Sequence, residues 1–140
     1  MPRSTFVRRV RFGGFRPLPA IIKNGGKWIM KVLVTGVKGQ LGHDVMNELA
    51  LRGIEGIGVD VEEMDITDRT ACETVISQEK PDAVIHCAAY TAVDAAEDNL
   101  ELCRKINAEG TRNIARVCKA MDIKMMYIST DYVVNGGGER

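Results

Sequence analysis

A glycine-rich turn between an apolar strand and an amphipathic helix is the feature that most limits how this chain can fold. Lys31 to Thr35 is a short β-branched run, and Gly36, Gly39 and Gly42 follow it in the spacing G-x-x-G-x-x-G. Apolar residues then recur at helical spacing. In such a unit the first glycine permits the tight turn, the second lets backbone approach a pyrophosphate, and the third lets helix and strand pack closely. The spacing therefore predicts a dinucleotide-binding turn, with the helix N-terminus facing the phosphates.

The rest of the chain continues to alternate strands and helices. Apolar runs predict further strands, and helical spacing predicts the helices between them: strands at 54–60, 83–88 and 124–130, helices at 68–78 and 99–120. Apolar strands separated by helices are typical of a parallel sheet that is covered on both faces. We therefore expect a Rossmann-like, doubly wound α/β domain over 30–140, with its strands in the order 3-2-1-4. The sequence ends soon after the fourth strand, so the domain is expected to be incomplete.

The first 29 residues differ in composition from everything that follows. Residues 1–29 hold seven Lys and Arg and no Asp or Glu, with Gly and Pro interrupting any periodicity. We interpret them as an irregular basic leader, translated from a mistaken start upstream of Met30. A transit peptide and a nucleic-acid-binding arm are the alternatives.

The remaining charge and the cysteines narrow the class of protein. Residues 30–140 carry 12 basic and 19 acidic residues, so we expect positive charge to be confined to the leader and no nucleic-acid partner. Four cysteines without a Cys-x-x-Cys pair, and only two histidines, favour neither a metal site nor a disulfide framework. No apolar run reaches the ~20 residues of a membrane-spanning helix. We expect a cytoplasmic protein with reduced thiols.

Asp60 is the next residue that indicates a dinucleotide site. It ends the second predicted strand, 18 residues beyond Gly42, where a carboxylate can accept hydrogen bonds from ribose hydroxyls. Such a carboxylate favours NAD over NADP because it repels a 2′-phosphate, and Glu62 and Glu63 follow it in place of Lys or Arg. The alternative is that Asp60 only caps the turn.

Two loops are predicted to complete the pocket. Asp65 and Ile66 lie in the loop after Asp60, where side chains can meet an adenine ring, and Thr67 or Asp68 can also cap the next helix. The third strand ends in small or polar residues, which suit either close approach by a cofactor or tight packing: Ala88, Ala89, Tyr90 and Thr91.

Several other polar and sulfur-containing residues have a simpler interpretation. His86 lies within an apolar strand and is interpreted as a core histidine with satisfied hydrogen bonds. Asn107 either contacts the backbone of a neighbouring strand or faces solvent. The methionines near the last strand are interpreted as packing residues: Met121, Met125 and Met126.

Five strings in the sequence carry a resemblance to a known family. GVKGQLG, DITD, HCAAYTAVDAAE, INAEGT and STDYV together resemble the dTDP-4-dehydrorhamnose reductases, which are extended short-chain dehydrogenases, from Met30 to about Gly136. Members of that family use NADPH or NADH to reduce a 4-keto dTDP-sugar to dTDP-L-rhamnose. The resemblance implies that Gly39, Gln40 and Leu41 cradle the phosphates of NADP or NAD. It also implies that Asp60 faces the adenosine, and that Asp65, Ile66, Ala89, Tyr90 and Thr91 complete the pocket.

The same resemblance assigns chemistry to the end of the fourth strand. Thr130 matches the catalytic hydroxyl residue that binds the keto oxygen, and Asp131 matches a substrate-contacting position. The family also needs a Tyr-x-x-x-Lys pair, which this sequence lacks. We therefore expect the cofactor-binding N-terminal part of a reductase, inactive by itself, with a dTDP-sugar substrate and a homodimer implied by the family.

Two other functions stay open on the sequence. A non-catalytic, NAD(P)-binding regulatory subunit can keep the glycine turn without the Tyr and Lys. A related sugar-nucleotide epimerase or dehydratase is disfavoured because those enzymes carry Phe-Ile where this chain has Gln40 and Leu41.

Overall fold

The computed structural model describes residues 30–90 and 99–129. These residues form alternating strands and helices, as the periodicity predicts, in the order β1 (Lys31–Thr35), α1 (Gln40–Leu51), β2 (Glu55–Val59), α2 (Arg69–Glu79), β3 (Ala83–His86), α4 (Leu100–Arg104), η1 (Lys105–Gly110), α5 (Thr111–Ala120) and β4 (Lys124–Tyr127). The structure also shows how two of these helices begin. The carboxylate of Asp68 caps α2 by accepting a hydrogen bond from the amide of Thr70, whereas α1 has no side-chain cap.

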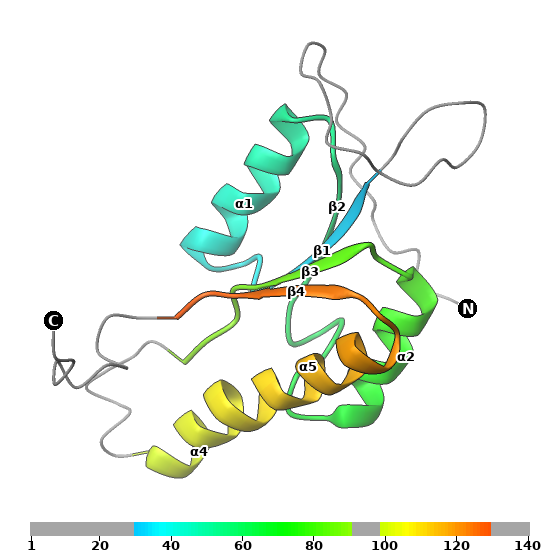
Figure 1. The fold of residues 1–140 in the computed structure, drawn as a ribbon. Helices are drawn as coiled ribbons and strands as arrows, with labels where there is room; N and C mark the ends of the chain where they lie inside the picture. The colour runs from blue at the N-terminus through cyan, green and yellow to red at the C-terminus, as the bar shows by residue number, and fades with distance from the viewer. Residues whose placement is uncertain (1–29, 91–98, 130–140) are drawn as a thin grey trace, which may run out of the picture.

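All four strands are parallel, in the order β2-β1-β3-β4. The fold class is confirmed, but the expected order 3-2-1-4 is wrong, because β3 pairs with β1 instead of lying outside β2. Helices α1 and α2 lie on opposite faces of the sheet (Figure 1). Strand–helix–strand crossovers are right-handed, so the face that a helix covers decides to which side the next strand is added. Because α1 and α2 cover opposite faces, β2 lies on one side of β1 and β3 lies on the other. The sequence does not show which face each helix covers.

Two apolar cores lie on the two faces of the sheet. The larger one packs the strands against α2 and α5, which lie side by side below the sheet in Figure 1. Leu33, Ile76, Val84 and Ile114 are fully buried in it. The smaller core packs Val32 and Val34 against α1. The central strand β1 is therefore buried on both faces, as a parallel sheet requires.

The helix expected over 99–120 is present but is not a regular α-helix. Its middle turn, η1, is π-helical, and the Thr111 hydroxyl donates to the Asn107 carbonyl oxygen at 2.7 Å. A side chain at Gly110 would place its Cβ 2.7 Å from the Cδ1 atom of Ile66, so glycine lets the loop after β2 pack against this turn. π-Helical turns of this kind often occur at functional sites.

The prediction that three methionines pack in the core holds for two of them. Met121 and Met125 pack against the larger core, but Met126 is 58% exposed. Successive side chains of a strand point to opposite faces, so Met126 points away from the face on which Met125 packs.

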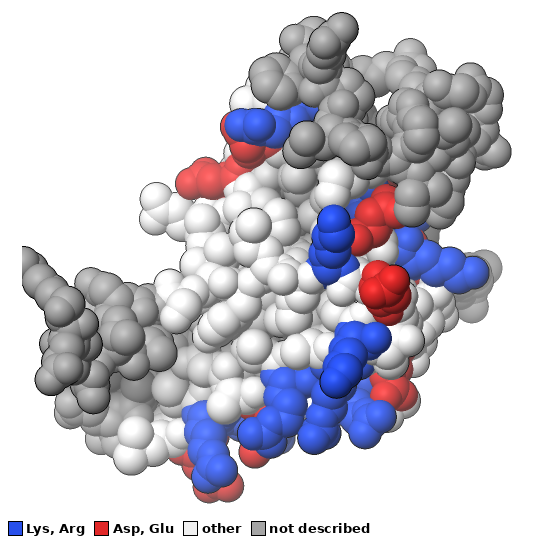
Figure 2. All heavy atoms as spheres, in the orientation of Figure 1, with Lys and Arg blue, Asp and Glu red and all other residues white. Residues whose placement is uncertain are grey.

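Positive charge is not confined to the leader, contrary to expectation. Figure 2 shows a row of Lys and Arg side chains along the α4–α5 helix, and the exposed basic residues of that helix are Arg104, Lys105, Arg112, Arg116 and Lys119. A net charge summed over 111 residues hides this separation, because acidic residues gather elsewhere in the sequence. Within the described residues, no helix is long and apolar enough to cross a membrane.

Candidate functional site

The glycine turn packs directly against the end of β3. Gly36 has φ of +72° and donates its amide to the carbonyl oxygen of Val59 at 2.9 Å. A Cβ atom at Gly36 would lie 2.7 Å from the Cα atom of Ala88. Both the backbone angle and the contact therefore require glycine, and they bring the ends of β1, β2 and β3 together at one point.

The other two glycines have different roles in the turn. A Cβ atom at Gly42 would overlap the Gly36 carbonyl group, so the third glycine lets α1 pack close to the strand. A Cβ atom at Gly39 would lie 3.3 Å from the Gly36 oxygen, which is tight but not an overlap. No acidic residue lies in the first turn of α1, and its amides have no side-chain cap. A helix N-terminus of this kind attracts an anion.

A cleft of about 920 Å³ opens at the carboxyl ends of β1, β2 and β3. Most of the predicted cofactor residues line this cleft: Gly36, Gly39, Gln40, Leu41, Gly42, Asp60, Asp65, Ile66, Ala88 and Ala89. Tyr90 is described but is not among the residues that line the cleft, and Thr91, Thr130 and Asp131 lie outside the described residues. Ile128 and Ser129, which directly precede Thr130, do line it. The chain therefore reaches the cleft immediately before the predicted catalytic position.

Exposed apolar side chains gather around the same cleft. Leu41, Val61, Leu102 and Ile128 are large, apolar and solvent-exposed, and all four line it. They come from α1, the loop after β2, α4 and the segment after β4. An apolar lining with a few polar groups is typical of a small-molecule site.

The carboxylate of Asp60 is held by two backbone amides. One oxygen accepts from Lys38 at 3.0 Å and the other accepts from Val61 at 2.9 Å. Asp60 therefore caps the turn, and the same side chain lines the cleft. Because a carboxylate oxygen can accept more than one hydrogen bond, Asp60 keeps the capacity to bind a ligand while it caps the turn.

Lys38 supplies a cation that the sequence analysis missed. Its ammonium lies 2.8 Å from the Glu62 carboxylate, and both side chains are mostly exposed, at 57% and 69%. The hydrogen bond that Lys38 donates to Glu62 raises the pKa of Lys38. The sequence places no Lys or Arg just after Asp60, but the fold brings one from the glycine turn to the same end of the cleft.

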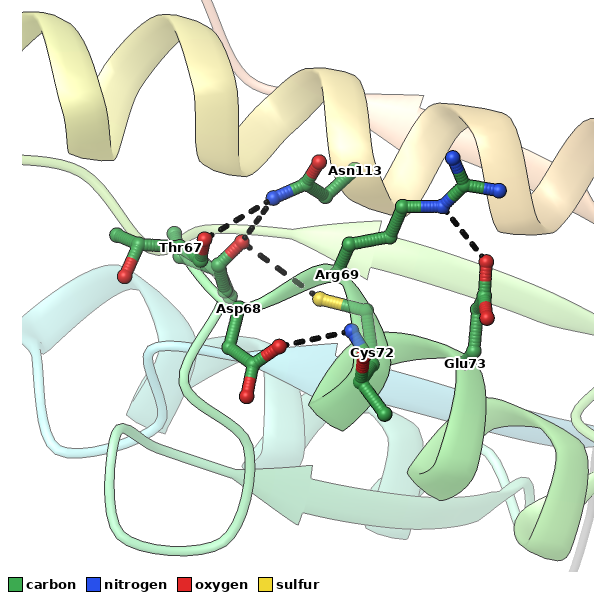
Figure 3. Close-up of polar contacts among 8 residues, drawn as sticks. Thr67, Asp68, Arg69, Cys72, Glu73 and Asn113 are labelled. Carbon is green, nitrogen blue, oxygen red and sulfur yellow. Dashed lines mark hydrogen bonds and ion pairs between the residues drawn. The ribbon is translucent and has the colours of Figure 1, made fainter.

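Polar contacts within the loop after β2, and from helices α2 and α5, hold this loop in place. The Asp65 carboxylate accepts from the amide and the hydroxyl of Thr67 at 2.9 and 2.7 Å. The Asn113 side chain of α5 donates to the carbonyl oxygens of Ile66 and Thr67 at 3.0 and 3.4 Å (Figure 3). The Cys72 thiol also approaches the Ile66 oxygen, at 3.6 Å, and burial raises its pKa to about 11. Asp65 and Ile66 are thus held at the cleft.

Asn107 holds the segment after β3 in a similar way. Its side-chain oxygen accepts from the Tyr90 amide at 2.8 Å, and its side-chain nitrogen donates to the Tyr90 carbonyl at 3.3 Å. The solvent-facing interpretation of Asn107 is therefore wrong. Asparagine is a poor helix former, so an asparagine within a predicted helix is a signal for such a role, and the sequence analysis missed it at Asn113.

His86 is a buried histidine with hydrogen bonds at both ring nitrogens, as predicted. It is 1% exposed, and burial lowers its pKa to about 4. Its partners are the hydroxyls of Thr35 and Thr111. Among the described residues, no group of three or more His, Cys, Asp or Glu side chains could hold a metal ion.

The parallel sheet, the helices on both faces and the glycine turn at the point where strand order reverses define a Rossmann-like α/β protein. Residues 30–140 match the protein-family model described as the RmlD substrate binding domain, and the chain belongs to this family.

Several named reductases are similar to this chain in sequence and in fold. A dTDP-4-dehydrorhamnose reductase from Streptomyces griseus is 39% identical over 108 residues, which cover 77% of this chain and 36% of the relative. The crystal structure of a dTDP-4-dehydrorhamnose reductase from Clostridium acetobutylicum matches with a TM-score of 0.73 and 40% identity, over 79% of this chain and 40% of that one.

A second crystal structure contains a cofactor. It is a dTDP-4-dehydrorhamnose reductase from Bacillus anthracis in complex with NADP, with a TM-score of 0.74 and 39% identity over 79% of this chain and 39% of that one. The chain therefore spans between a third and two-fifths of the relatives that it matches.

Proposed function

We propose that this chain binds NADPH or NADH in the cleft and forms the cofactor-binding part of a dTDP-4-dehydrorhamnose reductase. The reaction is the reduction of dTDP-4-dehydro-6-deoxy-L-mannose to dTDP-L-rhamnose. The observation that carries the proposal is the position of the glycine turn. It presents an uncapped helix N-terminus to a cleft that ten of the predicted cofactor residues line. The relative from Bacillus anthracis, crystallised in complex with NADP, supports a dinucleotide as the ligand.

The residues of the cleft fit a dinucleotide at both its phosphates and its adenosine. The amides at the start of α1 suit the pyrophosphate, since they are positively polarised and Gly39, the residue before the helix, has no side chain to keep a ligand from the backbone. Asp60 suits a ribose hydroxyl, and the apolar side chains of Val61 and Ile66 suit an adenine ring. When bound, the reduced nicotinamide would supply a hydride.

The chain's own contribution to the reduction would come from the end of β4. We assign to Thr130 the hydroxyl that polarises the keto oxygen, and to Asp131 a contact with the dTDP-sugar. The position of Ile128 and Ser129 in the cleft supports this assignment, because Thr130 is the next residue in the sequence. A proton donor of the Tyr-x-x-x-Lys type has no counterpart in this sequence.

Binding and turnover measured on the purified 140-residue chain test the proposal. NADPH fluorescence is titrated against the chain, and oxidation of NADPH is followed with the dTDP-4-keto sugar present. We expect saturable binding without turnover, since the sequence holds no Tyr-x-x-x-Lys pair to donate the proton. Failure to bind either NADPH or NADH would contradict the assigned site, and steady turnover would contradict the role as a cofactor-binding part only.

A further inference from the structure

A chain of hydrogen bonds centred on the buried His86 connects the end of β1, next to the glycine turn, to the π-helical turn. The Thr35 hydroxyl lies 2.7 Å from Nδ1 of His86 and accepts from the Ala88 amide at 3.1 Å. On the other side of the ring, Nε2 lies 3.0 Å from the Thr111 hydroxyl, which donates to the Asn107 carbonyl at 2.7 Å. We call these residues the His86 relay: Thr35, His86, Ala88, Thr111 and Asn107.

Counting hydrogens fixes the direction of every bond in the relay. The one hydrogen of the Thr111 hydroxyl is used on Asn107, so that oxygen can only accept from His86, and Nε2 must carry a hydrogen. The ring is neutral, so Nδ1 accepts the Thr35 hydroxyl hydrogen. The Thr35 oxygen is then free to accept from Ala88. Each donor has one acceptor, and no buried side-chain nitrogen or oxygen among the described residues lacks a partner.

One end of the relay is a backbone group of the cleft, and the other end holds Tyr90, which directly follows the cleft residues Ala88 and Ala89. Ala88 lines the cleft and lies against Gly36, the first glycine of the turn. Asn107, at the other end, bonds both backbone groups of Tyr90 in the segment after β3. The ring of Tyr127 stacks on the His86 ring with centroids 5.6 Å apart, which limits rotation of the imidazole. His86 itself does not line the cleft.

We propose that His86 is a positioning residue for the dinucleotide, which sets the separation between the glycine turn and the segment after β3 by bridging Thr35 and Thr111. This inference rests on the proposed cofactor site. It adds that affinity for the dinucleotide depends on the Thr111 hydroxyl, a group outside the cleft. The neutral Nε2–H form of the ring is required because only that form donates to Thr111 and accepts from Thr35.

Substitutions at Thr111 test the proposal without touching the cleft. Thr111→Val keeps the shape but removes the acceptor of the His86 hydrogen, and Thr111→Ser keeps the hydroxyl. We expect Thr111→Val to raise the dissociation constant for NADPH by up to about tenfold, the limit reached when the free energy of one hydrogen bond serves entirely to position the site. Thr111→Ser should stay within about twofold of the unsubstituted chain, since the hydrogen bond is restored.

A core substitution in the same helix separates positioning from stability. Ile114→Val removes a methylene from a fully buried side chain of α5 that does not line the cleft. It should lower the melting temperature, as Thr111→Val also does, but leave the dissociation constant unchanged. Unchanged affinity in Thr111→Val, or equal loss in Ile114→Val, would overturn the proposal. If the unsubstituted chain binds no dinucleotide, the cofactor site and this inference both fail, whereas unchanged affinity in Thr111→Val overturns this inference alone.

Discussion

The Lys38 side chain lines the cleft beside Asp60 and forms an ion pair with Glu62, which does not itself line the cleft. The ion pair of 2.8 Å holds the Lys38 ammonium on the Glu62 carboxylate, while the Asp60 carboxylate lines the cleft. An adenosine 2′-phosphate, which NADPH carries and NADH lacks, would compete with Glu62 for Lys38. The balance of these charges therefore bears on the choice between the two cofactors.

Glu62→Gln is expected to shift binding towards NADPH, because it removes a negative charge and frees Lys38. An exposed ion pair contributes about 1 kcal/mol at most, so the ratio of NADPH to NADH affinity should rise roughly threefold to fivefold. Lys38→Met should shift the ratio in the opposite direction. Glu73→Gln removes an equally exposed pair with Arg69, outside the cleft, and is the control. An unchanged affinity ratio in both Glu62→Gln and Lys38→Met would count against a role for the Lys38–Glu62 pair in the choice of cofactor.

The buried ring of His86 makes folding sensitive to acid. Burial lowers its pKa from 6.5 to about 4, so between these values the unfolded chain binds a proton that the folded chain does not. The free energy of unfolding should therefore fall as pH drops below 6.5, by roughly 3 kcal/mol once pH reaches 4. Urea unfolding across this pH range measures the loss. The His43 side chain is exposed on α1, so His43→Gln should keep the loss of stability that comes from His86. His86→Gln should abolish that loss. A His86→Gln profile parallel to that of the unsubstituted chain would contradict the assignment.

At the level of elements, the strand, the glycine turn and the helix that follows it were predictable from the sequence, whereas the irregular turn of the later helix was not. Local spacing identified β1, the three glycines and α1, because each depends on neighbouring residues in the sequence. The irregular turn η1 was not predicted, since a π-helical turn has no periodicity of its own. It depends on Thr111 bonding Asn107 and on Gly110 packing against Ile66.

Alanine substitutions at two glycines of the turn should separate folding from binding. Gly42→Ala places a methyl group on the Gly36 carbonyl and should destabilise the chain by several kcal/mol, because backbone must move. Gly39→Ala makes a tight contact at 3.3 Å that a small shift relieves, so it should keep most of the stability while weakening NADPH binding. Thermal unfolding and NADPH titration of both variants measure the two effects. A stable Gly42→Ala variant, or full affinity in Gly39→Ala, would contradict these roles.

For the molecule as a whole, the sequence predicted which segments reach the site but not how they are held there. Ten predicted cofactor residues line one cleft because strands of a parallel sheet all end at the same edge. The strand order was mispredicted because it depends on which face each helix covers. Asn113, Thr35 and Lys38 were missed because their partners are distant in the sequence and only the fold brings them together.

Amide hydrogen exchange with and without NADPH tests most directly whether this cleft is a dinucleotide site. Because the ligand would contact three separated segments, we expect slower exchange at 36–42, 60–67 and 88–90 when NADPH is added, with little change over most of α2. No change at saturating NADPH, or protection confined to segments away from the cleft, would contradict the account.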